Sequence, residues 1–225
     1  MLQIVDFLSS VPLFRGLARD TLYRLAEITR EKIYPKNGVI CFEGDPGDAL
    51  FIVRTGRVKV VLVGDDGREV ILGVLGIGEH FGELSLIDDQ PRSAHVIAME
   101  DARLLVLRRD DFRRRVEATP AIALAMLTEL SRRLRQADSK IGDLVLLDVP
   151  GRIARTLLEA APDVETNLVT RNLTHQTIAQ MIGSSRETVS RTMKDFQDAG
   201  WITVERREVR IADRPALERR ALIKR

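Results

Sequence analysis

The chain has 225 residues, of which 44% are hydrophobic and 30% charged, and its formal net charge is +2. This composition is that of a soluble globular protein, and the length allows two small domains. No apolar run is long enough to cross a membrane, and the first residues lack the pattern of a secretion signal, so we expect a cytoplasmic protein. Cys41 is the only cysteine, which excludes a disulfide framework and a zinc or iron–sulfur site built from several cysteines of one chain.

The N-terminal half changes its hydrophobic period once. Residues 1–30 carry apolar residues at helical spacing, and Asp20 is placed to favour the first turn of a helix. In residues 33–107 the period becomes two, and turns rich in Gly and Asp, such as residues 44–48 and 64–67, separate the short apolar runs. Many short strands broken by such turns predict a β-barrel or sandwich.

Residues 81–94 carry the groups that a nucleotide requires. Gly82 opens a short helix, where the backbone can approach an anion. Arg92 offers a planar fork of donors for phosphate oxygens, and Ser93 adds a hydroxyl. Glu83 is an acceptor that a ribose 2′-hydroxyl can satisfy. Phosphate donors and a sugar acceptor in one short segment predict a nucleotide pocket, with a glycine-rich β corner as the alternative.

The order of these residues, Phe81-Gly82-Glu83-Leu84-Ser85-Leu86 followed by Pro91-Arg92-Ser93-Ala94, resembles the phosphate-binding cassette of the cyclic-AMP receptor protein/fumarate-nitrate regulator (CRP/FNR) family. The resemblance implies that residues 1–119 form a cyclic-nucleotide-binding β-roll. It also implies a set of ligand-binding residues in the cassette: Gly82, Glu83, Leu84, Ser85, Arg92 and Ser93.

Residues 120–147 read as one long helix. Its apolar residues recur at alternating steps of four and three, as in the seam of a coiled coil: Ala123, Leu127, Leu130, Leu134, Ala137, Ile141 and Leu144. We interpret this segment as a dimerisation helix, which would match DNA of two-fold symmetry. The alternative is a helix that packs on its own β-roll.

Residues 148–225 form the third predicted part and are mildly basic, with 14 basic against 11 acidic residues. Asp148 precedes a proline that opens a new helix. Further on, Thr174 caps a helix that Gly183 ends, and a second helix follows from Arg186. This spacing predicts a helix-turn-helix.

The second of these helices has a polar face suited to a major groove. Arg186, Glu187 and Arg191 are chemically able to read G·C pairs, because arginine donates to guanine and glutamate accepts from cytosine. We expect phosphate contacts from Thr174, Gln176 and Ser185. Residues 185–191 resemble the recognition helix of the same family, which implies inverted-repeat operators with TGTGA-type half-sites. One departure is His175, where the family's best-known pattern has an arginine.

A β-hairpin is predicted directly after this helix. Residues 201–204 and 209–211 flank a charged tip at residues 205–208, which could reach the DNA backbone or minor groove. The whole chain is therefore expected to be an α+β protein: a β-roll with a long dimerisation helix, followed by a winged helix-turn-helix domain. Residues 214–225 read as a basic amphipathic tail that packs on this domain or keeps it soluble, with a DNA contact as the alternative.

The identity of the ligand rests on the long helix. By the resemblance, Ala137 and Asp138 fall where the family contacts the base. Ala137 cannot hydrogen-bond through its side chain, whereas Asp138 can accept from adenine or from guanine. We expect cyclic AMP. Cyclic di-GMP is the alternative, because Arg132, Arg133 and Arg135 could meet guanine edges, and a regulator that needs no ligand is a second alternative.

The other function classes have little support in the sequence. The three histidines, His80, His95 and His175, have no partners at catalytic spacing, so we expect no enzyme activity. No metal is expected. The sequence predicts a homodimeric transcription regulator with palindromic double-stranded DNA, and RNA polymerase, as its partners and with no membrane contact.

Overall fold

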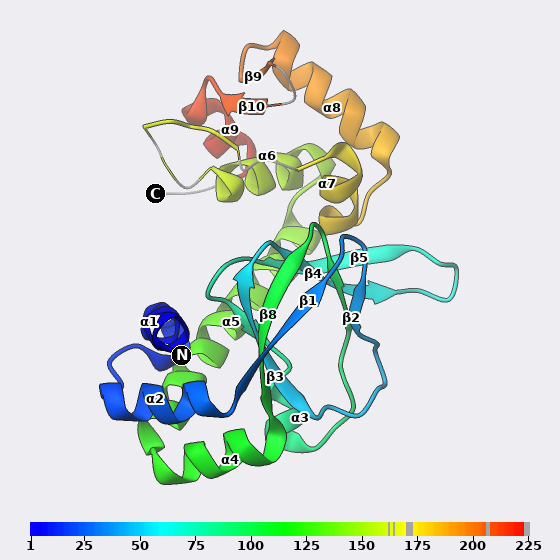
Figure 1. Cartoon of the computed structure of the whole chain (residues 1–225). Helices are drawn as coiled ribbons and strands as arrows, with labels where there is room; N and C mark the ends of the chain where they lie inside the picture. The colour runs from blue at the N-terminus through cyan, green and yellow to red at the C-terminus, as the bar shows by residue number, and fades with distance from the viewer. Residues whose placement is uncertain (162, 164, 170–172, 206–207, 223–225) are drawn as a thin grey trace. The chain divides into compact units, whose positions relative to one another are not determined.

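A computed structural model describes residues 1–161, 163, 165–169, 173–205 and 208–222. The chain divides into two compact units, residues 1–134 and 135–225. The division falls inside the long helix α5 (Pro120–Leu146), so this helix contributes to both units (Figure 1). The functional boundaries predicted at 119/120 and 147/148 follow the ends of elements instead, and they stay a prediction.

The first unit begins with helices. These are α1 (Leu2–Ser10), a 3-10 turn η1 (Pro12–Phe14) and α2 (Arg19–Glu27). Asp20 lies in the first turn of α2, as its position in the sequence predicts, and Leu22 and Leu25 on the apolar face of that helix are buried.

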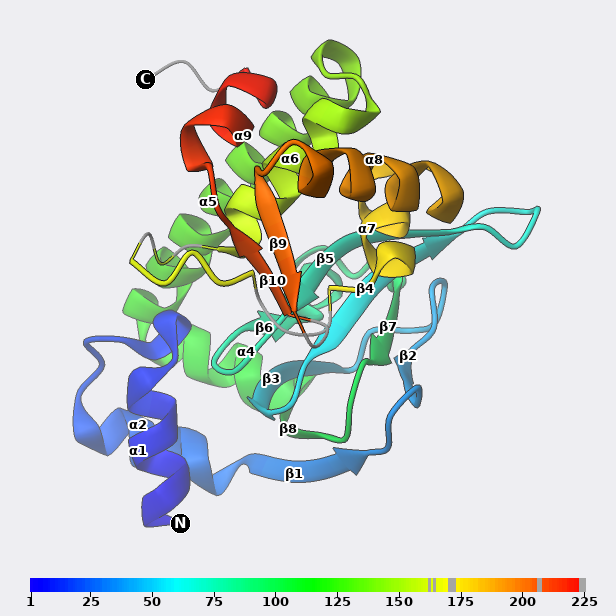
Figure 2. The ribbon, with the colours of Figure 1, turned by 90° about the horizontal axis from the view of Figure 1, so that it is seen from above.

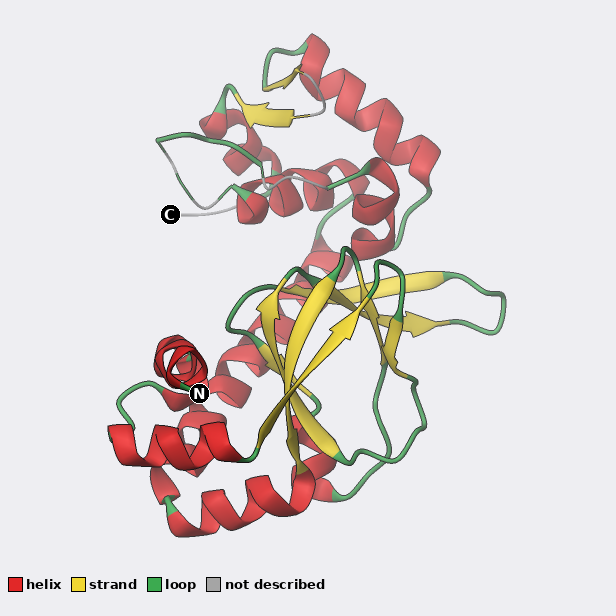
Figure 3. Ribbon diagram, viewed as in Figure 1, coloured by secondary structure: helices red, strands yellow, loops and turns green. Residues whose placement is uncertain are grey.

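Two antiparallel four-stranded sheets follow, drawn in yellow in Figure 3. One has the order β1-β8-β3-β6 and the other the order β2-β7-β4-β5. Their strands are β1 (Thr29–Tyr34), β2 (Val39–Cys41), β3 (Ala49–Thr55), β4 (Val58–Val63), β5 (Glu69–Leu75), β6 (His80–Phe81), β7 (His95–Ala98) and β8 (Ala102–Arg108). Helix α3 (Glu83–Asp88) interrupts the strands between β6 and β7, and α4 (Arg109–Ala118) follows β8. The predicted β-roll is confirmed.

Strand β3 shows how the period of two builds two cores. Phe51 and Val53 face the second sheet, in a core that also contains Cys41 and Leu104. Leu50 and Ile52 point to the opposite face and pack with the helices, where Phe14, Phe112 and Ile122 are fully or almost fully buried. Both faces of β3 are covered, so a continuous apolar run suits this strand. Burial of these side chains is the main contribution to the folding free energy of the β-roll.

The second unit contains the rest of α5 and a small helical domain. Its elements are α6 (Val149–Ala160), α7 (His175–Ile182), α8 (Arg186–Asp198), β9 (Ile202–Glu205), β10 (Glu208–Ile211) and α9 (Arg214–Arg220). Asp148 caps α6 by accepting from the Gly151 N–H at 3.0 Å. Strands β9 and β10 pair as an antiparallel hairpin, and Figure 2 shows the two strands side by side. The predicted winged helix-turn-helix is therefore present, and α7, α8 and the hairpin share one core around Ile178, Val189 and Phe196.

Three further observations concern the sole cysteine, metal-binding groups and the lengths of the helices. Cys41 is buried, and this burial raises the pKa of its thiol to about 11. Among the described residues, no group of three or more His, Cys, Asp or Glu side chains is arranged to hold a metal ion. In the same part of the chain, no helix is long and apolar enough to span a bilayer.

Candidate functional site

The predicted cassette folds around Gly82. This residue is the N-cap of α3 and has φ +86°, a left-handed conformation that glycine adopts without strain. A Cβ atom here would lie 2.3 Å from Nη1 of Arg92 and 2.9 Å from the carbonyl oxygen of Ala49. Glycine is thus required twice, once for the backbone angle and once for the close approach of Arg92.

Arg92 is buried in the cassette, with 6% of its surface exposed. Its Nη1 donates to the Gly82 carbonyl at 2.9 Å and its Nη2 to the Ala49 carbonyl at 2.8 Å. The guanidinium also lies 5.6 Å from the centre of the Phe51 ring and 3.8 Å from a carboxylate oxygen of Asp48. A cation held in this way is oriented before any ligand arrives.

Glu83 is buried beside it, at the start of α3, with 3% exposure. Its Oε1 accepts from Nη1 of Arg133 at 3.0 Å, and Nη2 of Arg133 donates to the carbonyl of His80 at 2.6 Å. Its Oε2 is buried and has no hydrogen-bond partner within the described residues. Burial raises the pKa of this carboxyl, although Arg133 opposes the rise. An unsatisfied buried acceptor of this kind is costly, and it suits an incoming hydroxyl donor.

A second carboxylate organises the arginines of α5. Glu129 accepts from Arg132 at 2.6 and 2.8 Å and from Arg133 at 2.9 Å. These hydrogen bonds, chiefly that from Arg132, lower the pKa of Glu129 to about 2. His80 is almost fully buried nearby, and its pKa falls to about 4 through burial first and the charge of Arg133 second.

The roles of His80, Glu129 and Arg133 in this cluster are not predicted from the sequence. The spacing of Glu129 to Arg132 and Arg133, three and four residues on a helix, is a signal for two of the ion pairs. The contact of Arg133 with Glu83 spans 50 residues and has no such local signal.

The other predicted ligand residues differ in their surroundings. Leu84 and Ser93 are exposed, whereas Ser85 is buried against Gly47. A Cβ atom on Gly47 would lie 2.1 Å from the Cβ of Ser85, so the loop of residues 44–48 rests directly on α3. The structure therefore brings Gly82, Glu83, Ser85 and Arg92 together, and Leu84 and Ser93 adjoin them in the chain with exposed side chains. Asp138 is an exposed residue of the second unit and is described with it.

The helix-turn-helix has the caps that the sequence predicts. Thr174 accepts from the Thr177 N–H at 3.1 Å, and Ser185 accepts from the Thr188 N–H at 3.1 Å. Gly183, with φ +64°, ends α7. Two of the expected phosphate ligands, Thr174 and Ser185, are thus also the N-caps of the two helices.

Helix α8 presents a charged face to solvent. Arg186, Glu187 and Arg191 are exposed, and Val189 on the opposite side is fully buried. Hydrogen bonds from its own backbone N–H and from the Ser185 hydroxyl lower the pKa of Glu187. Gln176 on α7 is also exposed. The hairpin residues at 206 and 207, predicted to reach DNA, lie outside the described residues.

Helix α5 leaves most of its predicted seam uncovered. Leu127 and Leu134 are 61% and 64% exposed in the first unit, and Ile141 and Leu144 are likewise exposed in the second. The apolar residues of α5 that pack on the β-roll are different ones, including Ile122 and Met126. Large apolar side chains in a regular exposed stripe are typical of a protein–protein contact.

Comparison with known proteins agrees with both the nucleotide-binding β-roll and the helix-turn-helix domain. The cyclic nucleotide-binding domain family matches residues 31–119, and the Crp-like helix-turn-helix domain family matches residues 151–220. The CRP-like cAMP-activated global transcriptional regulator of Mycobacterium tuberculosis is 36% identical over 221 residues, covering 96% of this chain and 99% of that protein. The cyclic AMP receptor protein of Thermus thermophilus is 35% identical over 207 residues, covering 90% of this chain and 95% of that protein.

Solved structures show the same fold. The catabolite activator protein of Thermus thermophilus matches with a TM-score of 0.55 and 34% identity, covering 94% of this chain and 98% of that one. The c-di-GMP responsive global regulator CLP of Xanthomonas campestris matches with a TM-score of 0.75 and 27% identity, covering 86% and 99%. Given the two domain matches in this order and relatives that align over almost their whole length, the chain belongs to the CRP/FNR family of cyclic-nucleotide-binding, DNA-binding transcription regulators.

Proposed function

We propose that the chain is a homodimeric transcription regulator whose affinity for inverted-repeat DNA is controlled by cyclic AMP. The observation that carries this proposal is the buried Oε2 of Glu83, which has no hydrogen-bond partner in the part of the chain that the structure describes and lies in the same cassette as the buried cation of Arg92. A cyclic nucleotide offers a hydroxyl donor to the first and a phosphate to the second.

Each cassette residue has a role in this proposal. Arg92 donates to the phosphate, and the backbone N–H groups after Gly82, together with Ser93, complete its surroundings. Glu83 keeps one oxygen on Arg133 and takes the ribose 2′-hydroxyl on the other, so binding would satisfy an acceptor that has no partner among the described residues. Ser85 and Leu84 shape the wall.

The base contact rests on Asp138. In the proposed dimer, its carboxylate accepts from the amino group of adenine and closes the pocket. For the ligand to act as a switch, it must favour the DNA-binding state by about 2 to 3 kcal/mol. The name of the Mycobacterium tuberculosis relative, a cAMP-activated regulator, supports cyclic AMP as this ligand.

Cyclic di-GMP is the second candidate, because the similar protein CLP is described as c-di-GMP responsive. The contacts of two arginines of α5 make cyclic di-GMP less favourable. Arg132 and Arg133 are already held by the carboxylates of Glu129 and Glu83. A guanine edge would have to break these ion pairs, which makes cyclic AMP the better ligand for this pocket.

On the DNA side, we propose that Arg186, Glu187 and Arg191 read a TGTGA-type half-site and that Thr174, Gln176 and Ser185 contact phosphates. The exposed seam of α5 would join two chains, so that the two α8 helices meet half-sites one helical turn apart, roughly 34 Å. RNA polymerase is the proposed partner of the DNA-bound dimer. No enzymatic step is part of this function.

Calorimetry with cyclic AMP, cyclic GMP, cyclic di-GMP and 2′-deoxy cyclic AMP tests the pocket. Wild-type protein should bind cyclic AMP about tenfold more tightly than the 2′-deoxy analogue, because a hydrogen bond to a charged group contributes about 1.5 kcal/mol. The Glu83→Gln variant should lose most of this preference, since its amide is a weaker acceptor. Equal affinity of wild-type protein for the two nucleotides would contradict the role of Glu83.

Operator binding tests the rest. A duplex with inverted TGTGA half-sites should bind more tightly when cyclic AMP is present, and Leu134→Glu should give a monomer in sedimentation and abolish this binding. A response to cyclic di-GMP alone would favour the second ligand. An operator affinity that no nucleotide changes would favour the ligand-independent alternative.

A further inference from the structure

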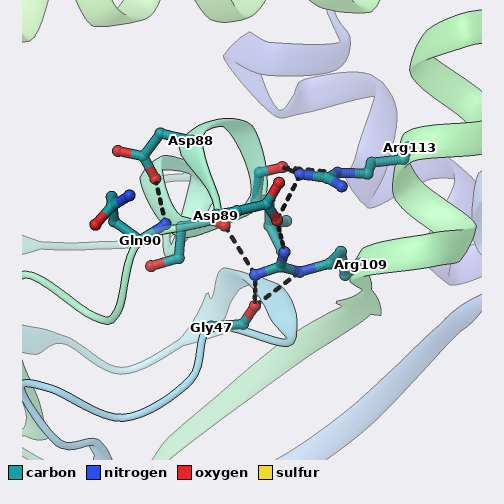
Figure 4. A network of polar contacts seen from close by, with 8 residues as sticks. Gly47, Asp88, Asp89, Gln90, Arg109 and Arg113 are labelled. Atoms are coloured by element: carbon teal, nitrogen blue, oxygen red, sulfur yellow. Dashed lines mark hydrogen bonds and ion pairs between the residues drawn. The ribbon is translucent and has the colours of Figure 1, made fainter.

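Helix α3 of the cassette is held at its C-terminal end by an arginine that the proposed function does not use. Arg109, the first residue of α4, donates from Nε to the Gly47 carbonyl at 2.9 Å and from Nη2 to the Ser85 carbonyl at 2.9 Å. Its Nη2 also contacts the Gly47 carbonyl, and its Nη1 pairs with Asp89. Figure 4 shows the guanidinium directed at Gly47 and Asp89 together.

Arg113, one turn further along α4, completes the contact. It donates to the Leu86 carbonyl at 2.8 and 2.6 Å and to the Asp89 carboxylate at 2.9 Å. A helix as short as α3 leaves its last carbonyls without backbone donors, and here the Gln90 N–H bonds the Asp88 side chain at 3.0 Å instead. The two arginines supply the missing donors and place positive charge at the negative end of the helix.

Arg92 and Arg109 therefore connect the same two segments at opposite ends of α3. Arg92 joins the carbonyl of Gly82, just before the helix, to that of Ala49. Arg109 joins the carbonyl of Ser85, inside the helix, to that of Gly47. Arg109 thus holds the loop of residues 44–48 against α3, and Arg92 holds the start of β3, which follows this loop, against the same helix.

Their positions suit different tasks. Arg92 lies where the proposed ligand's phosphate binds, so some of its donors turn to the ligand. The donors of Arg109 are directed at protein acceptors from three segments: the loop, α3 and its C-cap Asp89. We propose that Arg109 is a positioning residue of the nucleotide site, which keeps residues 44–48 closed on α3 while Arg92 binds the phosphate. This inference rests on the proposed function for the identity of the ligand.

The variant Arg109→Gln tests the inference, with Arg108→Gln as its matched control. Arg108 is the neighbouring residue, is exposed, and its side chain forms no hydrogen bond or ion pair within the described part of the chain. Arg109→Gln should weaken cyclic AMP binding about tenfold in calorimetry, and the control should stay within about twofold. At saturating cyclic AMP, both variants should bind operator DNA as wild type does, because the affected step is ligand binding.

Hydrogen exchange of the ligand-free protein separates this inference from the proposed function. In Arg109→Gln, the amides of residues 44–48 and 83–88 should exchange faster, while the rest of the β-roll and the control variant are unchanged. If wild-type protein binds no cyclic nucleotide, the proposed function is wrong. Hydrogen exchange then still tests whether Arg109 holds residues 44–48 on α3. Unchanged exchange in both segments would overturn the inference, as would faster exchange throughout the first unit, which indicates a merely structural role.

Two milder variants cover the case in which Arg109→Gln does not fold. Arg109→Lys keeps the charge but cannot reach two carbonyls and a carboxylate at once, so it should show a similar loss of cyclic AMP affinity. Asp89→Asn leaves the carbonyl contacts in place and should lose only about two- to threefold. Wild-type affinity in Arg109→Lys would contradict a positioning role for the guanidinium.

Discussion

The nucleotide cassette and the recognition helix use charged residues in opposite ways. In the cassette, Arg92 and Glu83 are buried, and both are hydrogen-bonded before a ligand is present. On α8, Arg186 and Arg191 are exposed and form no ion pair within the described residues. The desolvation of the cassette charges is thus completed during folding, whereas that of the DNA-reading charges is left to the complex.

This difference predicts two kinds of mutational response. A change in the cassette alters both the stability of the protein and its ligand affinity, because the same hydrogen bonds serve both. A change on the exposed face of α8 alters DNA binding alone, because surface substitutions away from packed features cost less than about 0.5 kcal/mol of stability.

The largest effect is expected from Arg92→Ala. It leaves the carbonyls of Gly82 and Ala49 without their donor, so the free energy of unfolding should fall by about 2 to 4 kcal/mol. Affinity for cyclic AMP should fall at least about 100-fold. Urea unfolding and calorimetry measure the two effects, with the exposed Arg103→Ala as control. Loss of affinity without loss of stability would contradict the idea that the same hydrogen bonds of Arg92 serve both folding and ligand binding.

A pH effect of about 2 kcal/mol is expected from His80. Its pKa is about 4 in the folded protein against 6.5 when unperturbed, so the unfolded chain takes up a proton first as the pH falls. Stability from this group is complete above pH 6.5 and is lost as the pH falls toward 4; between pH 7 and 5 the loss is about 2 kcal/mol.

Urea unfolding of wild type and His80→Phe at pH 7 and pH 5 isolates this effect. The raised pKa of Glu83 acts in the opposite direction above pH 4.5, so only the difference between the two proteins is informative. The lowered pKa of Glu129 acts below that range. The same pH dependence in both proteins would contradict a buried neutral histidine, and His175→Gln serves as the control.

On the recognition helix α8, Arg186→Ala should weaken the free energy of operator binding by about 1 to 3 kcal/mol at one G·C position. Non-specific DNA binding of this variant should stay unchanged. Its thermal stability should match wild type. Competition assays with operators altered one base pair at a time measure the effect, and Arg186→Lys should lose part of the preference because it cannot donate in a fork. An equal loss on every sequence would assign Arg186 to phosphate instead.

The smallest effect is expected from Thr174, and it separates the role of this residue as a helix cap from its proposed contact with a DNA phosphate. Thr174→Ala removes the acceptor of the Thr177 N–H and should destabilise the second unit by about 1 kcal/mol, whereas Thr174→Ser should keep the cap. If both variants keep operator affinity, the threonine is a cap alone. A loss in Thr174→Ala that exceeds its loss of stability would support the phosphate contact.

The sequence predicts best the features that depend on near neighbours. The caps at Thr174 and Gly183 and the glycine at position 82 each follow from a few adjacent residues, and the structure confirms these elements. The missed features join distant segments. Arg133 meets Glu83 across 50 residues and Arg109 meets Gly47 across 62, and nothing local indicates either pairing.

Helix α5 shows a second reason why some features cannot be predicted from the sequence. Its apolar spacing predicts a seam, and the exposed Leu127 and Leu134 agree with one, but the same spacing says nothing of which residues pack on the β-roll. Ile122 and Met126 do so, because the sheet and the N-terminal helices happen to cover that side. Only the three-dimensional arrangement separates the two faces.

The buried cysteine offers a way to time the motions of the β-roll. Cys41 lies in the core between the sheets, and its high pKa leaves almost no thiolate at neutral pH, so the folded protein should resist thiol reagents. Labelling then requires that the sheets separate. Because no other cysteine competes, the rate of labelling is a clock for this opening, and its slowing by bound nucleotide would show how tightly the ligand holds the roll closed.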